Sequence, residues 1–166
     1  PELYISALAK CRFLLLLDLS WNQIRFVPNN SFTKATILKI LQLAFNWIDN
    51  LQFTKLDSLE YLNLTCNRLF IVRKYFFSNL TSIKILSLSN MNISSIADYS
   101  FANQAKLHSL YLHNNSLHII TKYTLYGLNN LNILQLQGND IKKIDQKFAI
   151  GIQNSNIMIS TSSVVF

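Results

Sequence analysis

Three closely spaced histidines are the first residues of this chain whose type and spacing suggest chemistry. His108, His113 and His118 follow one another at five-residue intervals, and imidazoles can ligate zinc or exchange protons near neutral pH. No Asp or Glu accompanies them in the same stretch to orient an imidazole, and no Ser–His or Cys–His pair is indicated. The sequence therefore predicts three solvated or partly packed histidines, with no metal site and no catalytic residue.

Cysteine and glycine usage does not support other chemistry. Cys11 and Cys66 fall at different positions of the repeat described below and two repeats apart, so we expect no disulfide between them. No cysteine or histidine spacing suits zinc. The chain has only 3 glycines, and none belongs to a phosphate-binding loop. We therefore expect free thiols, no cofactor and no enzyme activity.

Asn-x-Ser/Thr sequons are candidates for covalent modification, because they accept glycans in secreted proteins. They begin at Asn29, Asn63, Asn79, Asn92 and Asn114. Asn29 and Asn79 fall on predicted loops and are the better glycosylation candidates, with Asn92 and Asn114 also retained. Asn63 is predicted to project from a binding surface, where a sugar would obstruct contact, so we expect it to be unmodified.

Composition and charge limit the classes of partner. Half of the residues are hydrophobic and 14% are charged, which excludes a disordered chain. The net charge of +7 suggests nucleic acid or an anionic surface, but the basic residues are scattered and only Arg73–Lys74 and Lys142–Lys143 are adjacent. We therefore expect no nucleic-acid partner. The longest apolar run, residues 13–17, is far shorter than the roughly 20 residues a bilayer requires, so we expect no membrane contact from this chain itself.

The elements that carry these residues follow from a repeat that runs along the chain. The pattern Leu-x-x-Leu-x-Leu-x-x-Asn-x-Leu/Ile occurs six times, with steps of 24, 21, 24, 24 and 24 residues between copies. Its Asn position is occupied in turn by Asn22, Asn46, Asn67, Met91, Asn115 and Asn139. A Phe or Leu six residues ahead of each copy keeps the same phase: Leu8, Phe32, Phe53, Phe77, Phe101 and Leu125. Six copies in one register predict a stack of similar coils.

Elementary geometry explains the spacing of the pattern. Each Leu-x-Leu predicts a short strand whose two leucines point inward while the residue between them faces out. The Asn follows where the chain turns away, and its amide can satisfy backbone groups buried in that turn. We therefore predict a structural ladder formed by Asn22, Asn46, Asn67, Asn115 and Asn139. No single coil can bury its leucines alone, so stability comes from stacking of neighbours.

Over essentially its whole length the chain resembles the typical, 24-residue class of leucine-rich repeats. The resemblance implies an α/β repeat solenoid, a curved horseshoe with a parallel β-sheet on the concave face and irregular or short helical returns outside. We interpret residues 1–166 as one leucine-rich-repeat domain, a fragment with about six full repeats, partial repeats at both ends and no cysteine caps.

The chain departs from the regular pattern in three places. The third coil is three residues short between Leu51 and Phe53, which predicts a local change of curvature on the convex side. Met91 replaces a ladder Asn, so Asn90, Asn92 or a water takes over, or the ladder is broken. The end coils are irregular: Leu3 and Leu8 fit the second half of a preceding coil, Phe148 falls one place early, and Ile157, Ile159 and Val164 predict a degenerate strand.

The strand phase also predicts the surface that recognises a ligand. The residue before the first inward Leu and the residue between the two inward Leu should face out in every coil. With the aromatic residues just beyond the strands, these positions give the predicted ligand-binding set: Leu16, Asp18, Trp21, Ile40, Gln42, Phe45, Tyr61, Ile85, Tyr111, His113, Ile133 and Gln135. An apolar stripe beside a nearly uncharged polar stripe suits a protein or peptide partner, although strand propensity alone also explains the isoleucines.

The resemblance implies a function in recognition, because this repeat class is typical of Toll-type receptors, small proteoglycans and receptors with leucine-rich ectodomains. We predict extracellular recognition of a ligand by the concave face, in a larger receptor or adhesion protein. We expect that protein to be secreted, or to lie on the extracellular side of the plasma membrane and be tethered to the membrane by a part outside this chain. An ectodomain of a G-protein-coupled receptor is the narrower expectation. The alternatives are an intracellular scaffold or adaptor, and a charge-driven nucleic-acid or glycosaminoglycan binder with steeply salt-dependent affinity.

Overall fold

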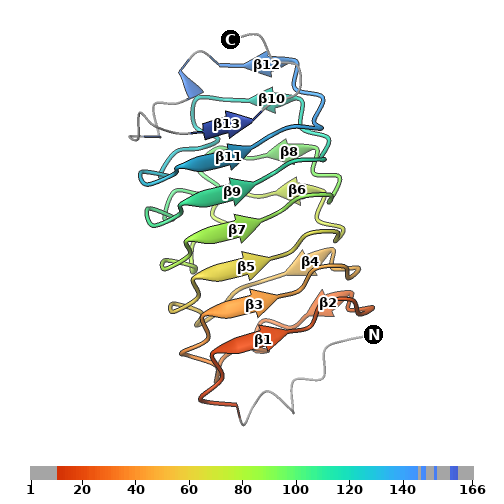
Figure 1. The fold of residues 1–166 in the computed structure, drawn as a ribbon, viewed down its shortest axis with the longest axis vertical. Helices are drawn as coiled ribbons and strands as arrows, with labels where there is room; N and C mark the ends of the chain where they lie inside the picture. The colour runs from red at the N-terminus through yellow and green to blue at the C-terminus, as the bar shows by residue number, and fades with distance from the viewer. Residues whose placement is uncertain (1–10, 146, 149–151, 153–157, 161–166) are drawn as a thin grey trace.

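The computed structural model describes residues 11–145, 147–148, 152 and 158–160, and it shows a stack of parallel coils (Figure 1). Three-residue strands along one side form a seven-stranded parallel sheet in the order β1-β3-β5-β7-β9-β11-β13 within this part of the chain. They are β1 (Leu16–Asp18), β3 (Ile40–Gln42), β5 (Tyr61–Asn63), β7 (Ile85–Ser87), β9 (Ser109–Tyr111), β11 (Ile133–Gln135) and β13 (Met158–Ser160). The predicted repeat solenoid with a parallel sheet is confirmed.

The register of the sheet follows the repeat. Leu17 pairs with Leu41, and in the last pair of strands Leu134 pairs with Ile159, which confirms that the degenerate seventh strand continues the stack. In the long sheet, the central residue of each strand from β3 to β11 is buried, while its two neighbours in the strand mostly keep some exposure. Leu3, Leu8, Ile157 and Val164, which belong to the predicted irregular ends, lie outside the described residues.

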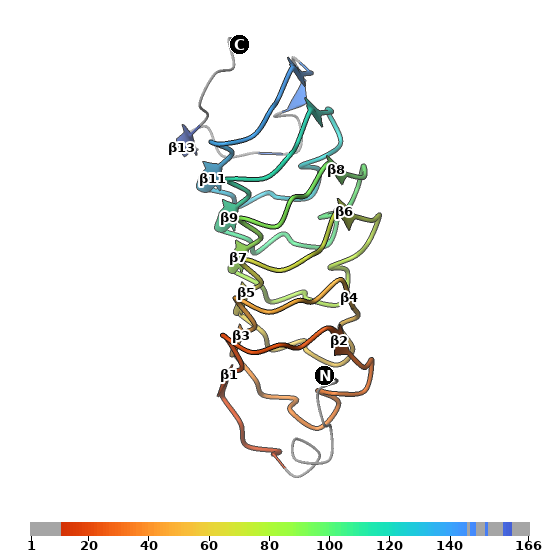
Figure 2. The same cartoon turned by 90° about the vertical axis from the view of Figure 1, so that its right-hand side faces the viewer.

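Short two-residue strands occupy the opposite side of the coils. They are β2 (Phe26–Val27), β4 (Asn50–Leu51), β6 (Ile71–Val72), β8 (Ser95–Ile96), β10 (Ile119–Ile120) and β12 (Lys143–Ile144). They pair only as β2–β4, β6–β8 and β10–β12 in the described part of the chain. Figure 2 shows the two columns of strands facing each other, with the long sheet on the slightly hollowed side.

The returns between the strands are turns. No α-helix occurs in the described residues, and the returns of this part of the chain are turns, apart from a 3-10 conformation at Phe148. A helix long and apolar enough to cross a bilayer is likewise absent from this part of the chain.

Leucines and phenylalanines from successive coils fill the space between the two strand columns. Leu41, Leu62, Leu86 and Leu110 are fully buried. The Phe series stacks on the returning side, where the rings of Phe77 and Phe101 lie 5.7 Å apart at an interplanar angle of 4°. Each coil therefore buries its apolar residues against the next coil, as the repeat requires.

Asn115 shows how a ladder amide ties two coils together. Its Oδ1 accepts hydrogen bonds from the backbone N–H groups of Met91 (3.0 Å) and Ile93 (2.9 Å) in the preceding coil. Its Nδ2 donates to the carbonyl oxygens of Leu88 (2.8 Å) and Leu112 (2.9 Å), one in each coil. Similar bonds to two coils are made by Asn46, Asn67 and Asn139.

The ladder changes at its first and fourth positions. Asn22 is exposed, and its amide donates to Leu19 and Ser20 of its own coil. Met91 is fully buried at the fourth position and carries no amide, so the coil of Asn67 receives no such bond from residue 91. Asn90 and Asn92 flank Met91 but are exposed, both with positive φ. The ladder is therefore interrupted at this coil.

We expect Asn115→Ala to lower the free energy of unfolding by about 3 kcal/mol, because two buried N–H groups lose their acceptor. Urea denaturation followed by circular dichroism measures the change. Met91→Leu is the matched control at the equivalent position of the neighbouring coil, and it should cost less than about 1.5 kcal/mol because its volume is conserved. Equal costs for the two variants would show that the ladder bonds do not stabilise the fold.

Candidate functional site on the concave face

The pairing of the long sheet brings the predicted ligand-binding residues into columns. Leu16 pairs with Ile40, Ile40 with Tyr61, and Tyr61 with Ile85, and the same column continues through Ser109 to Ile133. The second column is formed in the same way by Asp18, Gln42, Asn63, Ser87, Tyr111 and Gln135. An apolar column and a polar column thus run side by side across the coils.

In the middle coils, hydrogen bonds join side chains of the polar column to residues just after the strands. Thr65 Oγ1 lies 2.7 Å from Ser87 Oγ and 3.2 Å from Ser89 Oγ, and the Asn63 side chain accepts the Thr65 backbone N–H. Ser89 and Ala44 are buried. Some residues just after the strands are therefore withdrawn from the surface, whereas every residue of the polar column from Asp18 to Gln135 keeps some exposure.

A turn of constant backbone shape follows each strand of the long sheet from β1 to β11. The residue immediately before the ladder position has positive φ in all six coils: Trp21, Phe45, Cys66, Asn90, Asn114 and Gly138. Asn and Gly suit this left-handed conformation, and a Cβ at Gly138 would meet Asn114 Oδ1 at 2.1 Å. Trp and Phe are costly there, because a bulky residue with positive φ is strained.

The two aromatic residues at this turn position stack on each other at the rim of the sheet. The ring centroids of Trp21 and Phe45 lie 3.7 Å apart with the planes 7° from parallel. Trp21 is nonetheless 75% exposed. An exposed aromatic pair held in a strained backbone conformation is typical of a binding site, since burial does not compensate for the strain.

Asp18 carries the only formal charge in the two strand columns as far as Gln135. Its Oδ1 accepts the Ser20 backbone N–H at 2.9 Å, and this bond lowers the pKa of the carboxyl. Gln42 Nε2 donates weakly to Oδ2 at 3.4 Å. The carboxylate therefore remains ionised and exposed at one end of the surface.

Tyr111 and His113 form a second aromatic group on the later coils. Their rings make an edge contact with centroids 6.4 Å apart and an interplanar angle of 86°. His113 Nδ1 is buried without a hydrogen-bond partner, and so is Gln137 Oε1 in the next coil. These two unsatisfied polar atoms lie near the aromatic pair and away from Trp21 and Phe45.

The three histidines do not converge. His108 Nε2 lies 2.9 Å from Asn132 Nδ2, whereas His118 pairs with Asp140 at 3.2 Å and donates from Nδ1 to the Ser116 carbonyl oxygen. No group of metal-ligating side chains is found among the described residues. Asp140 escaped the sequence analysis because it belongs to the next coil, although the repeat register would have found it.

Charged residues that sequence reasoning missed border the apolar column. Glu60 lies between two lysines of the neighbouring coils, 3.4 Å from Lys39 Nζ and 2.8 Å from Lys84 Nζ. The Lys84 hydrogen bond lowers the pKa of the Glu60 carboxyl. These residues directly precede the strands, so the register predicts their alignment once they are compared coil by coil.

The sequons occupy different surroundings. Asn29, Asn92 and Asn114 are exposed. Asn79 is also exposed, but its Nδ2, the atom that would carry a glycan, donates to the Phe53 carbonyl oxygen at 2.7 Å. The Asn63 Oδ1 accepts the Thr65 N–H on the concave face, as described above.

Comparison with known proteins identifies the family. The profile described as leucine rich repeat matches residues 57–117 and 81–141, which together make up just over half of the chain. The chain belongs to the leucine-rich repeat family. No protein with a curated description matches it.

Several solved structures share the fold. A chain of the TLR13–ssRNA13 complex is 26% identical with a TM-score of 0.80, covering 98% of this chain and 27% of that one. A leucine-rich repeat protein of Leptospira interrogans is 22% identical with a TM-score of 0.71, covering 84% and 34%. A chain of the Drosophila Toll–Spatzle complex is 20% identical with a TM-score of 0.76, covering 96% and 25%. The leucine-rich repeat chain spans about a quarter to a third of these proteins.

We expect Trp21→Asn to change the free energy of unfolding by less than about 1 kcal/mol. Loss of the stack with Phe45 costs about 0.5–1.5 kcal/mol, and relief of the left-handed strain returns about 1–2 kcal/mol. Urea denaturation measures the free energy of unfolding of this variant and of Leu41→Ala. Leu41→Ala is a core control that should lose about 2–5 kcal/mol. A loss above about 2 kcal/mol for Trp21→Asn would assign Trp21 to the scaffold.

Proposed function

We propose that this chain recognises a protein or peptide ligand on its concave face, as part of a larger receptor that is secreted or exposed outside the cell. The observation that carries the proposal is the exposed Trp21–Phe45 stack at two strained turn positions that follow strands β1 and β3 of the concave sheet. Exposed aromatic anchors of this kind commonly provide most of the binding energy in protein interfaces. The likeness to chains of the TLR13 and Toll complexes supports a receptor role.

The charge distribution favours a protein ligand over a polyanion. The strand columns from Leu16 to Gln135 contain no Lys or Arg, and their single acid is Asp18. Lys39, Glu60 and Lys84 border the apolar column and partly neutralise one another. An apolar centre with a charged rim is the usual organisation of a protein interface.

Single-stranded RNA is a second candidate ligand. The TLR13 structure is of a complex with ssRNA13, and this chain carries a net charge of +7. Phosphate contacts would have to come from cations outside the two strand columns. Binding of a 20-nucleotide RNA should then fall steeply with salt concentration, whereas binding of a protein through the apolar column should change little.

We expect Trp21→Asn and Tyr111→Ala each to weaken binding of a protein ligand by at least tenfold without unfolding the chain. The probes are purified secreted proteins and receptor ectodomains, screened by surface plasmon resonance, and circular dichroism checks folding. Tyr126→Ser is the matched control, because Tyr126 is an exposed aromatic residue, 45% exposed, that lies outside the strand columns. Unchanged affinity in both concave-face variants would contradict the proposal.

We expect the chain to carry N-linked glycans when it is expressed in a secretory host. Occupancy should be highest at Asn29, Asn92 and Asn114 and lower at Asn79, where a glycan would have to displace the bond to Phe53. Asn63, on the concave face, should stay unmodified. Glycosidase treatment followed by gel mobility, with Asn→Gln variants at each position, measures this. Absence of any shift in a secreted sample would count against the extracellular assignment.

A further inference from the structure

The short third coil lacks a turn that other coils possess. After β2, β6, β8 and β10 the chain turns outward, closed by bonds from the N–H groups of Ser31, Phe76, Ser100 and Thr124 to the carbonyls of Pro28, Arg73, Ala97 and Thr121. After β4 only Gln52 separates Leu51 from Phe53, and the described backbone has no such bond there. The missing three residues are therefore the missing turn.

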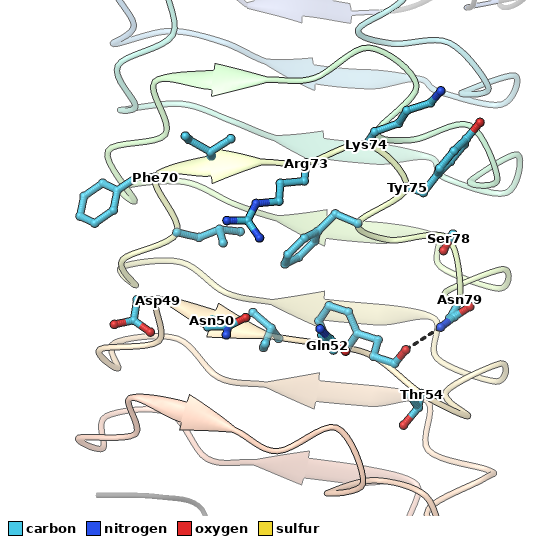
Figure 3. Close-up of a pocket in the computed structure, with 15 residues that line it drawn as sticks. Asp49, Asn50, Gln52, Thr54, Phe70, Arg73, Lys74, Tyr75, Ser78 and Asn79 are labelled. Carbon is cyan, nitrogen blue, oxygen red and sulfur yellow. Dashed lines mark hydrogen bonds between the residues drawn. The ribbon is translucent and has the colours of Figure 1, made fainter.

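The missing turn leaves a hollow on the side of the molecule opposite the long sheet. A cavity of about 580 Å³ lies between the segments 49–54 and 69–79 (Figure 3). A backbone bond from Arg68 N to Ile48 O bounds it at one end, and the bond from Asn79 Nδ2 to Phe53 O bounds it at the other. Its volume is within the range of ordinary ligand sites.

Two strand edges face each other across this hollow without pairing. β4 pairs with β2 and β6 pairs with β8, but β4 and β6 belong to different sheets. β8 and β10 are also unpaired, yet that gap is bridged by the Tyr99 N–H bond to Tyr123 O (3.1 Å) and by the stack of the two rings. The gap between β4 and β6 therefore differs from the gap between β8 and β10, because a hollow lies beside its strand edges.

The side chains around the hollow combine exposed apolar groups with an uncompensated cation. Phe70 and Ile71 are 53% and 51% exposed. Arg73 makes no ion pair within the described part of the chain, and Figure 3 shows its guanidinium in the space between β6 and Asn50. Lys74 lies over the rings of Tyr75 (4.8 Å) and Tyr99 (5.3 Å). Asp49 is the single acid of the lining.

We propose that the hollow between β4 and β6 binds an extended peptide segment that carries an Asp or Glu. The segment adds a strand to the free edges, its apolar side chains contact Phe70 and Ile71, and its carboxylate pairs with Arg73. A small anion could use Arg73 but would leave the strand edges and apolar side chains without a partner, which favours the peptide. This site is separate from the concave face, so the proposal does not depend on the function proposed above.

The sharpest variant restores the regular repeat length. Inserting Pro-Asn-Asn between Leu51 and Gln52 copies residues 28–30 and should rebuild the turn that fills the hollow. Arg73→Gln removes only the cation, and Lys106→Gln is its matched control because Lys106 is exposed elsewhere on the chain. Circular dichroism and thermal melting establish whether each variant folds. If the insertion variant fails to fold, Arg73→Gln still decides the test.

The probe is a phage-displayed library of eight-residue peptides, selected on the wild-type chain with the insertion variant as soluble competitor. We expect selected peptides to contain Asp or Glu beside β-branched residues. Synthetic copies should bind the insertion variant and Arg73→Gln at least tenfold more weakly than the wild type, as measured by fluorescence anisotropy. Lys106→Gln and Trp21→Asn should bind them normally. N-methylation of alternate amides should weaken binding in both phases, because alternate N–H groups of the added strand face β4 and β6 in turn.

Three results would overturn the proposal. The first is a selection that yields no peptide able to distinguish the wild type from Arg73→Gln. In the second, the selected peptides lose affinity for Trp21→Asn instead, which places them on the concave face. In the third, sodium acetate alone displaces the peptides at low millimolar concentration, which means that Arg73 binds a free anion and the strand edges contribute nothing.

Discussion

The contact between inward-facing leucines of successive coils is the interaction on which the whole molecule depends. Leu41, Leu62, Leu86 and Leu110 come from separate coils and are fully buried because each coil covers its neighbour. A single coil has no interior, so neither the strands nor the turns have a reason to form alone. The parallel sheet is a consequence of this stacking, since coils in register place equivalent backbone groups at hydrogen-bonding distance.

Stacking creates a second requirement, because each turn beside the sheet buries backbone groups that water cannot reach. Asn115 meets this requirement with bonds to four backbone groups of two coils. The residue before it must then adopt positive φ, which Asn114 and Gly138 do easily. Trp21 and Phe45 occupy the same strained position with large aromatic side chains. The scaffold thus explains why the turn exists but not why aromatic residues are displayed on it, and this mismatch supports the assignment of function to the concave face.

The two irregularities of the repeat have different consequences. Met91 fills the space of the missing ladder amide with apolar atoms, so the stack continues and only hydrogen bonds are lost. No neighbouring residue can replace the three residues missing after Leu51, because in other coils the equivalent residues form an outward turn. Their loss leaves a hollow next to Arg73, between the unpaired strands β4 and β6. A deletion in a solenoid therefore acts locally, since each coil contacts only the coils beside it.

The sequence alone determined the number and register of the coils, the inward leucines, the ladder positions and the two outward columns, because a 24-residue period specifies side-chain direction within each copy. The missing turn was also visible as a short step. The hollow that results from it was not visible in the sequence, because a cavity depends on whether neighbouring turns close over a gap. Likewise, the partner of His118, the lysines around Glu60 and the bond of Asn79 join residues of adjacent coils. The register aligns these residues between adjacent coils, but only the tertiary structure decided which contacts form, since contacts depend on rotamers and coil spacing that the period does not contain.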